Sequence, residues 1–239
     1  MEKETIFTGK TLKWIAILSM FIDHATVALL EPRLAMEGYE RIGRFDVFTL
    51  YQLGRSLGRW AFPIFCFLLV EGFFHTRSRT KMVRNLCIFA LISEIPFDLL
   101  FSQTSFFPGY QNIFFTLLLG YLGLWVMYQE NWKVYYKILG LLALAGATYF
   151  IRSDYGLNGY LAILIYGVIY PLKRIYRVPA TMAAFYFEGW WAMTAFIPIY
   201  LYNGKRGNLR LGKYFFYIFY PAHLLILYLI SYALYGGSF

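Results

Sequence analysis

The stretch "LKWIAILSMFIDHATVALL", residues 12–30, decides the fold class of this chain. As a helix it would cover roughly 30 Å at 1.5 Å per residue, which is the thickness of the hydrocarbon core of a bilayer. No small-x-small cleavage site follows it, so we expect a first transmembrane helix and not a removed signal peptide. Asp23 and His24 lie inside this helix, where an ionisable side chain is costly unless it has a partner.

The composition of the whole chain supports a membrane protein. Of its 239 residues, 59% are hydrophobic and 15% are charged, whereas a soluble domain has about 25% charged residues. Aromatic residues reach 22%, as expected where Tyr and Trp rings gather at the headgroups. No linker, repeat or low-complexity block divides the sequence. We therefore expect an all-α, polytopic integral membrane bundle that forms one domain, residues 1–239.

Apolar runs predict eight spans, and a charged stretch separates the first from the second. That stretch, residues 31–59, is too charged to cross a bilayer but contains regularly placed apolar residues, which favours an interfacial amphipathic helix. The predicted spans are approximately 12–30, 60–75, 82–101, 112–128, 134–150, 157–171, 180–201 and 214–234.

The charge pattern fits these eight spans poorly. With the N-terminus inside, they place 12 of the 22 Lys and Arg residues in the cytoplasm and 10 outside, although basic loops usually remain cytoplasmic. The largest exception is "NGKRGNLRLGK", residues 203–213, which this count places outside. Glu188 and Gly189 interrupt the preceding segment 180–201, so a broken or re-entrant segment that returns the loop to the cytoplasm is an alternative.

The net charge of +9 is explained by membrane anchoring and topology. No contiguous basic module with interleaved aromatic residues is present, so we do not expect a nucleic-acid partner. Cys66 and Cys87 lie in apolar runs without metal-ligand spacing, and no HExxH, GxSxG or P-loop motif occurs. We expect no metal.

Several polar side chains lie where a bilayer should surround them. Asp23 and His24 are adjacent and point about 100° apart on a helix, so each needs its own partner, either for function or as a buried structural group. "SEIPFD" places Glu94 and Asp98 four residues apart on one face, unless they are only solvated at a helix end. His223 follows Pro221 in "YPAHLLIL" and fits either a packed residue or proton chemistry.

Two other ionisable residues near the second span have different expected roles. Arg59 is a candidate counter-ion for the carboxylates, because a guanidinium is permanently charged and binds two oxygens at once. His75 is expected at the membrane surface, beside Thr76 and Arg77.

The ordered set of motifs resembles one known family. These motifs are "LKWIAILSMFIDHATVALL", "GRWAFPIFCFLLVEGFFHTRSR", "ALISEIPFDLLF", "NIFFTLLLG", "DYGLNGYLAILI", "YLYNGKRG" and "FYIFYPAHLLIL". Together they are similar to the TraX family, named for a conjugal-transfer protein that N-acetylates pilin. Two of them are also similar to a wider group of transmembrane acyltransferases that includes the lysosomal heparan N-acetyltransferase and bacterial O-acyltransferases.

The resemblance implies a membrane enzyme that moves an acetyl or other acyl group from acyl-CoA to an amine or hydroxyl acceptor. A pilin-like peptide is one such acceptor, and the bacterial inner membrane is the implied location. The family's intramembrane "DH" maps onto Asp23 and His24, and shared motifs add Glu94, Asp98 and His223 as further catalytic candidates.

In this hypothesis His24 deprotonates the acceptor or briefly carries the acyl group. Asp23, Glu94 or Asp98 would hold its ring, and Arg59 would stabilise the oxyanion. The CoA phosphates need basic residues, although positive-inside topology alone also explains the basic loops. The candidates for binding CoA are Arg59, Arg77, Arg79, Lys81, Arg84, Lys205 and Arg206.

Two other classes of protein remain open on the sequence alone. A proton-coupled transporter for small solutes would use Asp23, Glu94 and Asp98 as protonation sites along a path. A membrane component of a conjugation or secretion apparatus could carry the same residues without any catalysis.

Overall fold

The computed structural model is mostly helical and describes residues 6–37, 41–43, 45–207 and 214–236. Five of its helices are long and apolar enough to cross a membrane, and two more apolar helices are shorter. The helices and strands, in chain order, are α1 Gly9–Glu37, β1 Arg41–Ile42, β2 Phe45–Asp46, α2 Val47–Gly58, α3 Ala61–His75, α4 Arg79–Ser102, α5 Ile113–Met127, α6 Val134–Ile151, α7 Gly156–Ile169, α8 Arg174–Ala184, η1 Tyr186–Glu188, α9 Trp190–Thr194, α10 Phe196–Tyr200 and α11 Phe215–Tyr235.

The chain divides into two compact units. Unit 1 contains residues 1–65, 96–105 and 188–239, and unit 2 contains residues 66–95 and 106–187. The helices α3 and α4 each contribute residues to both units, and the single domain expected from the sequence stays a prediction.

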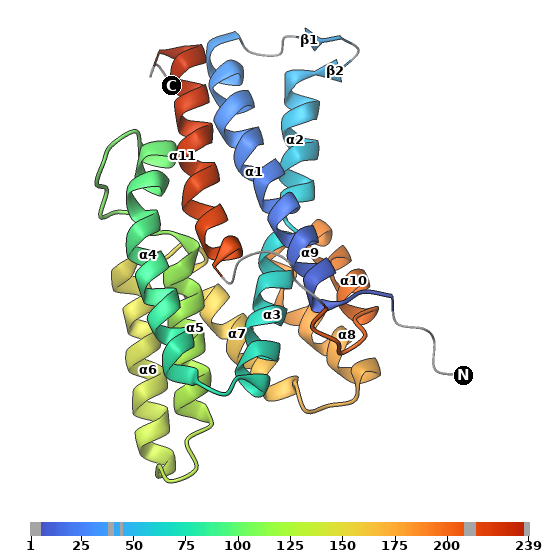
Figure 1. Ribbon diagram of the computed structural model, residues 1–239, viewed down its shortest axis with the longest axis vertical. Coiled ribbons are helices and arrows are strands. Elements are labelled where there is room, and N and C mark those ends of the chain that lie inside the picture. Colours follow the sequence, from blue (N-terminus) through green and yellow to red (C-terminus); the bar gives the residue numbers. More distant parts are fainter. Residues whose placement is uncertain (1–5, 38–40, 44, 208–213, 237–239) are drawn as a thin grey trace. The chain divides into compact units, whose positions relative to one another are not determined.

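In unit 1, α2 lies directly against α1 (Figure 1) because two glycines, one helical turn apart, face it. A Cβ at Gly54 would lie 1.9 Å from Thr26 Oγ1, and a Cβ at Gly58 would lie 2.3 Å from Asp23 Oδ1. Small residues at this spacing let two helix backbones approach closely. The helix predicted within residues 31–59 is therefore present, but it packs along α1, and together with α3 it forms one candidate span, residues 47–75.

The helices α1 and α11 run parallel and side by side in unit 1 (Figure 1). Near their first residues, the ring centroids of Trp14 and Phe215 lie 5.8 Å apart. Near their last residues, the Tyr235 hydroxyl donates to the Leu29 carbonyl at 2.7 Å. Eight segments that each crossed a membrane once would make the first and the last antiparallel. The packing of α1 with α11 therefore does not fit eight single crossings.

Residues 180–201, predicted as a span with a broken or re-entrant segment as the alternative, do not form one continuous helix. This segment contains the end of α8, the single turn η1 and the short helices α9 and α10, with Gly189 at a φ of 83° between η1 and α9. Only glycine adopts this backbone conformation at low cost. No helix within this segment has the length of a bilayer span.

The loop after α10 returns to the first residues of α1. The Gly9 amide donates to the Lys205 carbonyl at 2.9 Å, and Phe7 pairs with Tyr202 in a short parallel bridge. Of the two alternatives for this loop, the contacts of residues 202–207 fit the one in which the loop lies on the same side as the start of α1. Residues 208–213, with Arg210 and Lys213, lie outside the described residues.

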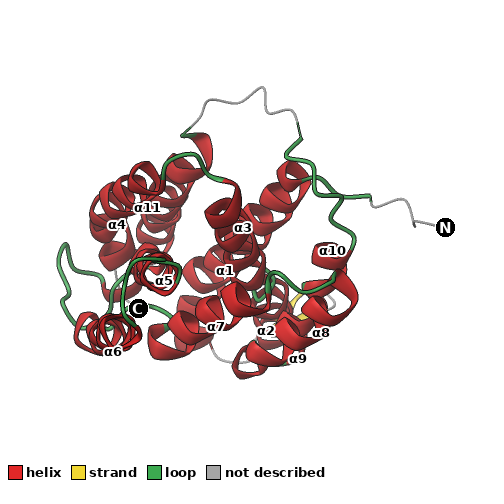
Figure 2. Ribbon diagram, turned by 90° about the horizontal axis from the view of Figure 1, so that it is seen from below, coloured by secondary structure: helices red, strands yellow, loops and turns green. Residues whose placement is uncertain are grey.

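Unit 2 is built around α5, α6 and α7, which lie next to one another when seen end on (Figure 2). The Tyr160 hydroxyl of α7 donates to the Leu141 carbonyl of α6 at 3.0 Å, and the Tyr128 hydroxyl donates to the Gly167 carbonyl at 2.8 Å. Asn112 caps α5, because its side chain accepts a hydrogen bond from the Phe114 amide.

Candidate site at the paired histidines

His24 of α1 and His223 of α11 form a direct hydrogen bond in unit 1. His24 Nδ1 lies 2.7 Å from His223 Nε2, and His223 Nδ1 lies 2.7 Å from the carbonyl oxygen of Phe219. The two rings are nearly coplanar, with 7° between their planes and 5.0 Å between their centroids. They therefore meet edge to edge, as an in-plane hydrogen bond requires.

The two hydrogen bonds of His223 determine which nitrogen of each neutral histidine ring carries the hydrogen. A backbone carbonyl only accepts, so His223 Nδ1 carries the hydrogen that bonds Phe219. The Nε2 atom of the same ring is then an acceptor, and His24 Nδ1 must be the donor to it. The remaining ring nitrogen, His24 Nε2, keeps its lone pair and makes no hydrogen bond to any described residue. The Nε2 atom of His24 can therefore accept a proton and act as a base.

Aromatic rings surround this pair. Phe101 of α4 and Tyr220 of α11 meet the His24 ring edge-on, with centroids 5.6 and 5.9 Å away. The Phe219 ring stacks on His223 at 4.9 Å, and His223 is only 3% exposed. These rings cover His223, whereas His24 is partly exposed.

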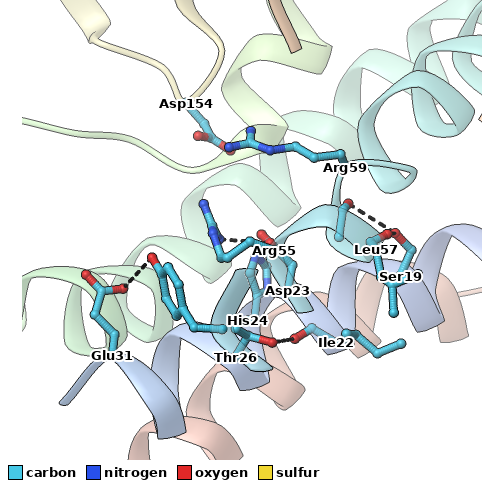
Figure 3. A network of polar contacts seen from close by, with 12 residues as sticks. Ser19, Ile22, Asp23, His24, Thr26, Glu31, Arg55, Leu57, Arg59 and Asp154 are labelled. Carbon is cyan, nitrogen blue, oxygen red and sulfur yellow. Dashed lines mark hydrogen bonds and ion pairs between the residues drawn. The ribbon is translucent and has the colours of Figure 1, made fainter. Parts of the chain in front are cut away.

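Asp23 and the adjacent residue His24 contact different partners. The Oδ1 atom of Asp23 lies 2.8 Å from the Arg55 guanidinium of α2, as Figure 3 shows. The expectation that Asp23 and His24 would each need a separate partner thus agrees with the contacts. The ring of His24 is oriented by His223, and the carboxylate expected to hold it is engaged with Arg55 instead.

Arg55 is a site residue that the sequence analysis missed. It lies within the charged stretch 31–59, of which the sequence analysis names only Arg59 as a counter-ion for the carboxylates. Its spacing of four residues before Arg59 is the signal that could have found it, because both cations then lie on one face of a helix.

Arg59, the predicted counter-ion, pairs with Glu188. Its Nη1 atom lies 3.0 Å from Glu188 Oε2, and the side chain of Glu188 is 6% exposed. Burial raises the pKa of Glu188, and the charge of Arg59 offsets part of this effect. The neighbouring Trp60 Nε1 donates to Thr194 Oγ1 at 2.7 Å. These two contacts fasten the broken segment to the turn between α2 and α3.

Glu94 and Asp98 belong to different units although they share α4. In unit 2, Glu94 Oε2 accepts a hydrogen bond of 2.6 Å from Asn112 Nδ2, which also donates to the Ala90 carbonyl. In unit 1, Asp98 is 1% exposed and lies one helical turn before Phe101, the residue that touches His24. The alternative of mere solvation at a helix end does not fit the burial of Asp98, whereas Glu94 is half-buried and hydrogen-bonded to Asn112.

The basic candidates for CoA occupy two places. In unit 2, the Arg79 guanidinium lies 4.3 Å from the centroid of the Phe73 ring, while Arg77, Lys81 and Arg84 are exposed. In unit 1, Lys205 and Arg206 are exposed beside the first residues of α1, where the Arg206 carbonyl accepts from the Lys10 amide.

Two smaller expectations can also be compared with the structure. The surface position predicted for His75 is confirmed, since its side chain is 66% exposed. Among the described residues, no group of three His, Cys, Asp or Glu side chains could hold a metal ion.

The fold and the site define a helical membrane protein with a hydrogen-bonded histidine pair inside its helices. The family model described as "TraX protein" matches residues 8–231, and the chain belongs to this family. It is also 29% identical over 253 residues to "Probable fimbrial assembly protein FimC, serogroup H1" from Dichelobacter nodosus, a match that covers 95% of this chain and 97% of that protein. No solved structure matches the chain.

Proposed function

We propose that this protein is a membrane-embedded acyltransferase that moves an acetyl or other acyl group from acyl-CoA to an amine or hydroxyl acceptor. The observation that supports this most is the hydrogen-bonded series from the Phe219 carbonyl through His223 to His24, which leaves His24 Nε2 as a base. Such a series, in which one group orients a ring and the ring's other nitrogen takes a proton, is a recurring arrangement in acyl-transfer sites.

In the proposed reaction the acceptor nitrogen or oxygen attacks the thioester carbonyl carbon, and His24 Nε2 takes the acceptor's proton. The tetrahedral oxyanion then collapses, the C–S bond breaks, and the CoA thiolate receives that proton from His24. Because His24 donates to a neutral imidazole and not to a carboxylate, its protonated form is held less tightly and returns the proton readily. The acyl group never needs to rest on the enzyme.

An α-amine is the acceptor we propose first. The TraX family and the relative named as a fimbrial assembly protein support a component of conjugation or pilus assembly, so a pilin-type peptide is a suitable substrate. An α-amine has a pKa of about 7.7–8.0 in solution and is partly protonated near neutral pH, so a base at the site would increase its reactive fraction.

The proposed topology has seven crossings, with the start of α1 in the cytoplasm of a bacterial inner membrane. The seven are the five long candidate spans and the two shorter apolar helices, and an odd number makes α1 and α11 parallel. Moving the four basic residues of loop 203–213 to the inside raises the number of cytoplasmic Lys and Arg residues from 12 to 16. Of the other six, Arg55 and Arg59 lie within the candidate span 47–75. This distribution fits the positive-inside rule and gives acyl-CoA a basic face on the cytoplasmic side.

The test is turnover by the purified protein. Acetyl-CoA and a panel of amine acceptors are supplied, and free CoA thiol is followed in the wild type, in His24→Ala and in His75→Ala. His75 is the matched control, because it is an exposed histidine far along the chain from the pair. We expect loss of activity in His24→Ala alone, by about 10²-fold to 10⁴-fold. Undiminished turnover in His24→Ala would remove His24 from the mechanism.

A binding measurement separates this proposal from the other two classes of protein. A ligand raises the melting temperature of the state that binds it, so CoA should stabilise an acyltransferase. Stabilisation by a transported solute and not by CoA would favour the proton-coupled transporter. No response to either, together with no turnover, would favour a non-catalytic component of the pilus apparatus.

A further inference from the structure

A second polar cluster lies in unit 2, where the last turn of α7 meets α3 and the start of α8. The Tyr170 hydroxyl donates to the Glu71 carboxylate, and the Phe74 and Tyr170 rings stack with centroids 4.3 Å apart. Arg177 lies on the other side of Tyr170, with its guanidinium 4.7 Å from the ring centroid, and its Nη1 atom donates to the Tyr170 carbonyl at 2.9 Å.

Two buried donors in this cluster lack an acceptor among the residues that the structure describes. Tyr166 is fully buried one helical turn before Tyr170, with its ring 6.0 Å from that of Phe67, and its hydroxyl has no hydrogen-bond partner among the described residues. The buried Nε atom of Arg177 likewise has no partner within the described part of the chain. A buried polar group without a hydrogen bond is costly, so such groups usually mark the place of a ligand or a strained site.

The surrounding charge indicates what would satisfy these donors. The N-cap residue of α8 is Lys173, whose side chain makes no capping hydrogen bond. Arg174 is the first residue of the helix, and its first turn has no acidic residue. The N-terminus of a helix with basic residues in its first turn attracts anions. The Glu71 carboxylate at this cluster already accepts from Tyr170 and lies 3.8 Å from His75 Nδ1. The two donors without an acceptor in the described part of the chain are therefore the neutral hydroxyl of Tyr166 and the cationic guanidinium of Arg177. Both can donate a hydrogen bond to an anionic oxygen.

We propose that Tyr166 and Arg177 form a binding site for a phosphate ester at the end of α7. One phosphate oxygen accepts from the Tyr166 hydroxyl and another from Arg177 Nε. Tyr166 lies three residues before the end of α7, so its Cα is roughly 5 Å along the helix axis from the polar end of the span. That is the depth at which a lipid headgroup or the phosphate of a soluble ligand such as CoA can enter.

The test measures the melting temperature of the full chain in a phosphate-free maltoside detergent. Three probes are added separately: short-chain phosphatidylglycerol, CoA and inorganic phosphate. We expect at least one of them to raise the melting temperature of the wild type, since a ligand stabilises the state that binds it. A rise with phosphatidylglycerol alone identifies a headgroup site, and a rise with CoA or phosphate identifies a site for a soluble phosphate.

Two variants and a control test whether the rise in melting temperature depends on the Tyr166 hydroxyl and on Arg177 Nε. Tyr166→Phe removes only the hydroxyl, and Arg177→Lys keeps the charge but removes Nε; each should abolish the ligand-dependent rise. Tyr160→Phe is the control on the same helix, because its hydroxyl already donates to Leu141. Without ligand, Tyr160→Phe should lower the melting temperature, whereas Tyr166→Phe should leave it unchanged or raise it.

This inference does not depend on the acyltransferase proposal, since it is measured by stability and not by turnover. It is overturned if none of the probes stabilises the wild type. It is also overturned if the probes stabilise Tyr166→Phe and Arg177→Lys as much as the wild type, because the phosphate then binds elsewhere on the basic surface.

Discussion

The Nε2 atom of His223 accepts a hydrogen bond of 2.7 Å from Nδ1 of His24, across two parallel helices whose residues are 199 positions apart in the sequence. This bond fixes both the tautomer and the orientation of the His24 ring. The pair therefore gives the site one defined base, and not two histidines that titrate separately.

The first prediction concerns His223 as a residue that positions His24. Under the proposed function, His223→Phe removes the acceptor of His24 Nδ1 and should lower kcat by about 10²-fold with little change in KM, because the base is then misaligned while substrate contacts remain. His223→Gln, which can still accept through its side-chain oxygen, should retain part of the activity. Steady-state kinetics on both variants check this, and equal activity in His223→Phe and the wild type would contradict it.

The second prediction concerns the close approach of α2 to α1. Gly58→Ala would place a Cβ 2.4 Å from the Asp23 Cβ, so the helices must separate, at a cost of about 1–3 kcal/mol. Gly146→Ala on α6 is the control, because no atom lies within 4 Å of its added Cβ. Chemical denaturation of the two variants measures the difference. If Gly58→Ala were as stable as Gly146→Ala, the packing of α1 on α2 would be wrong.

The third prediction concerns the ion pair between Asp23 and Arg55. Arg55→Gln leaves a partly buried carboxylate without its cation, and Asp23→Asn does the reverse, so each single change should destabilise the protein. The double variant should lose less than the sum of the two, with a coupling free energy of about 1–3 kcal/mol. A double-mutant cycle of unfolding free energies tests this. Strict additivity would mean that the two side chains do not interact.

The fourth prediction concerns the cap of α5. Asn112→Ala removes the acceptor of the Phe114 amide and the donor to Glu94, and should lower stability by about 1–2 kcal/mol. Lys133, the cap residue of α6, makes no side-chain capping bond, so Lys133→Ala serves as the comparison. Thermal melting of both variants measures the difference in stability. A similar small decrease in the melting temperature of each would contradict the capping role of Asn112.

The fifth prediction concerns the side of the membrane on which loop 202–207 lies. In a background with Cys87→Ser, Asn203→Cys should resist an impermeant thiol reagent added to intact cells, since this loop is bonded to the first residues of α1. Ser105→Cys, in the exposed loop between α4 and α5, should react readily. Rapid labelling of Asn203→Cys would instead place the start of α1 and this loop outside.

Local sequence patterns were enough to predict a helical membrane protein, most of its helices and the residues that need partners. Long apolar runs predict membrane helices, because within a bilayer the backbone groups of a single segment can form hydrogen bonds only inside a helix. This prediction depends only on local sequence. The same reasoning indicated the broken segment around Glu188 and the exposed position of His75.

Which partners those residues have depends on how the helices pack in three dimensions. The pairing of His24 with His223, and of Asp23 with Arg55, depends on α1 and α11 being parallel and on two glycines that bring α2 against α1. Neither pairing can be predicted from local sequence. Hydrophobicity determines that a helix enters the bilayer, but it does not determine which neighbouring helix it contacts. That choice is made by close packing and by hydrogen bonds between residues distant in the chain.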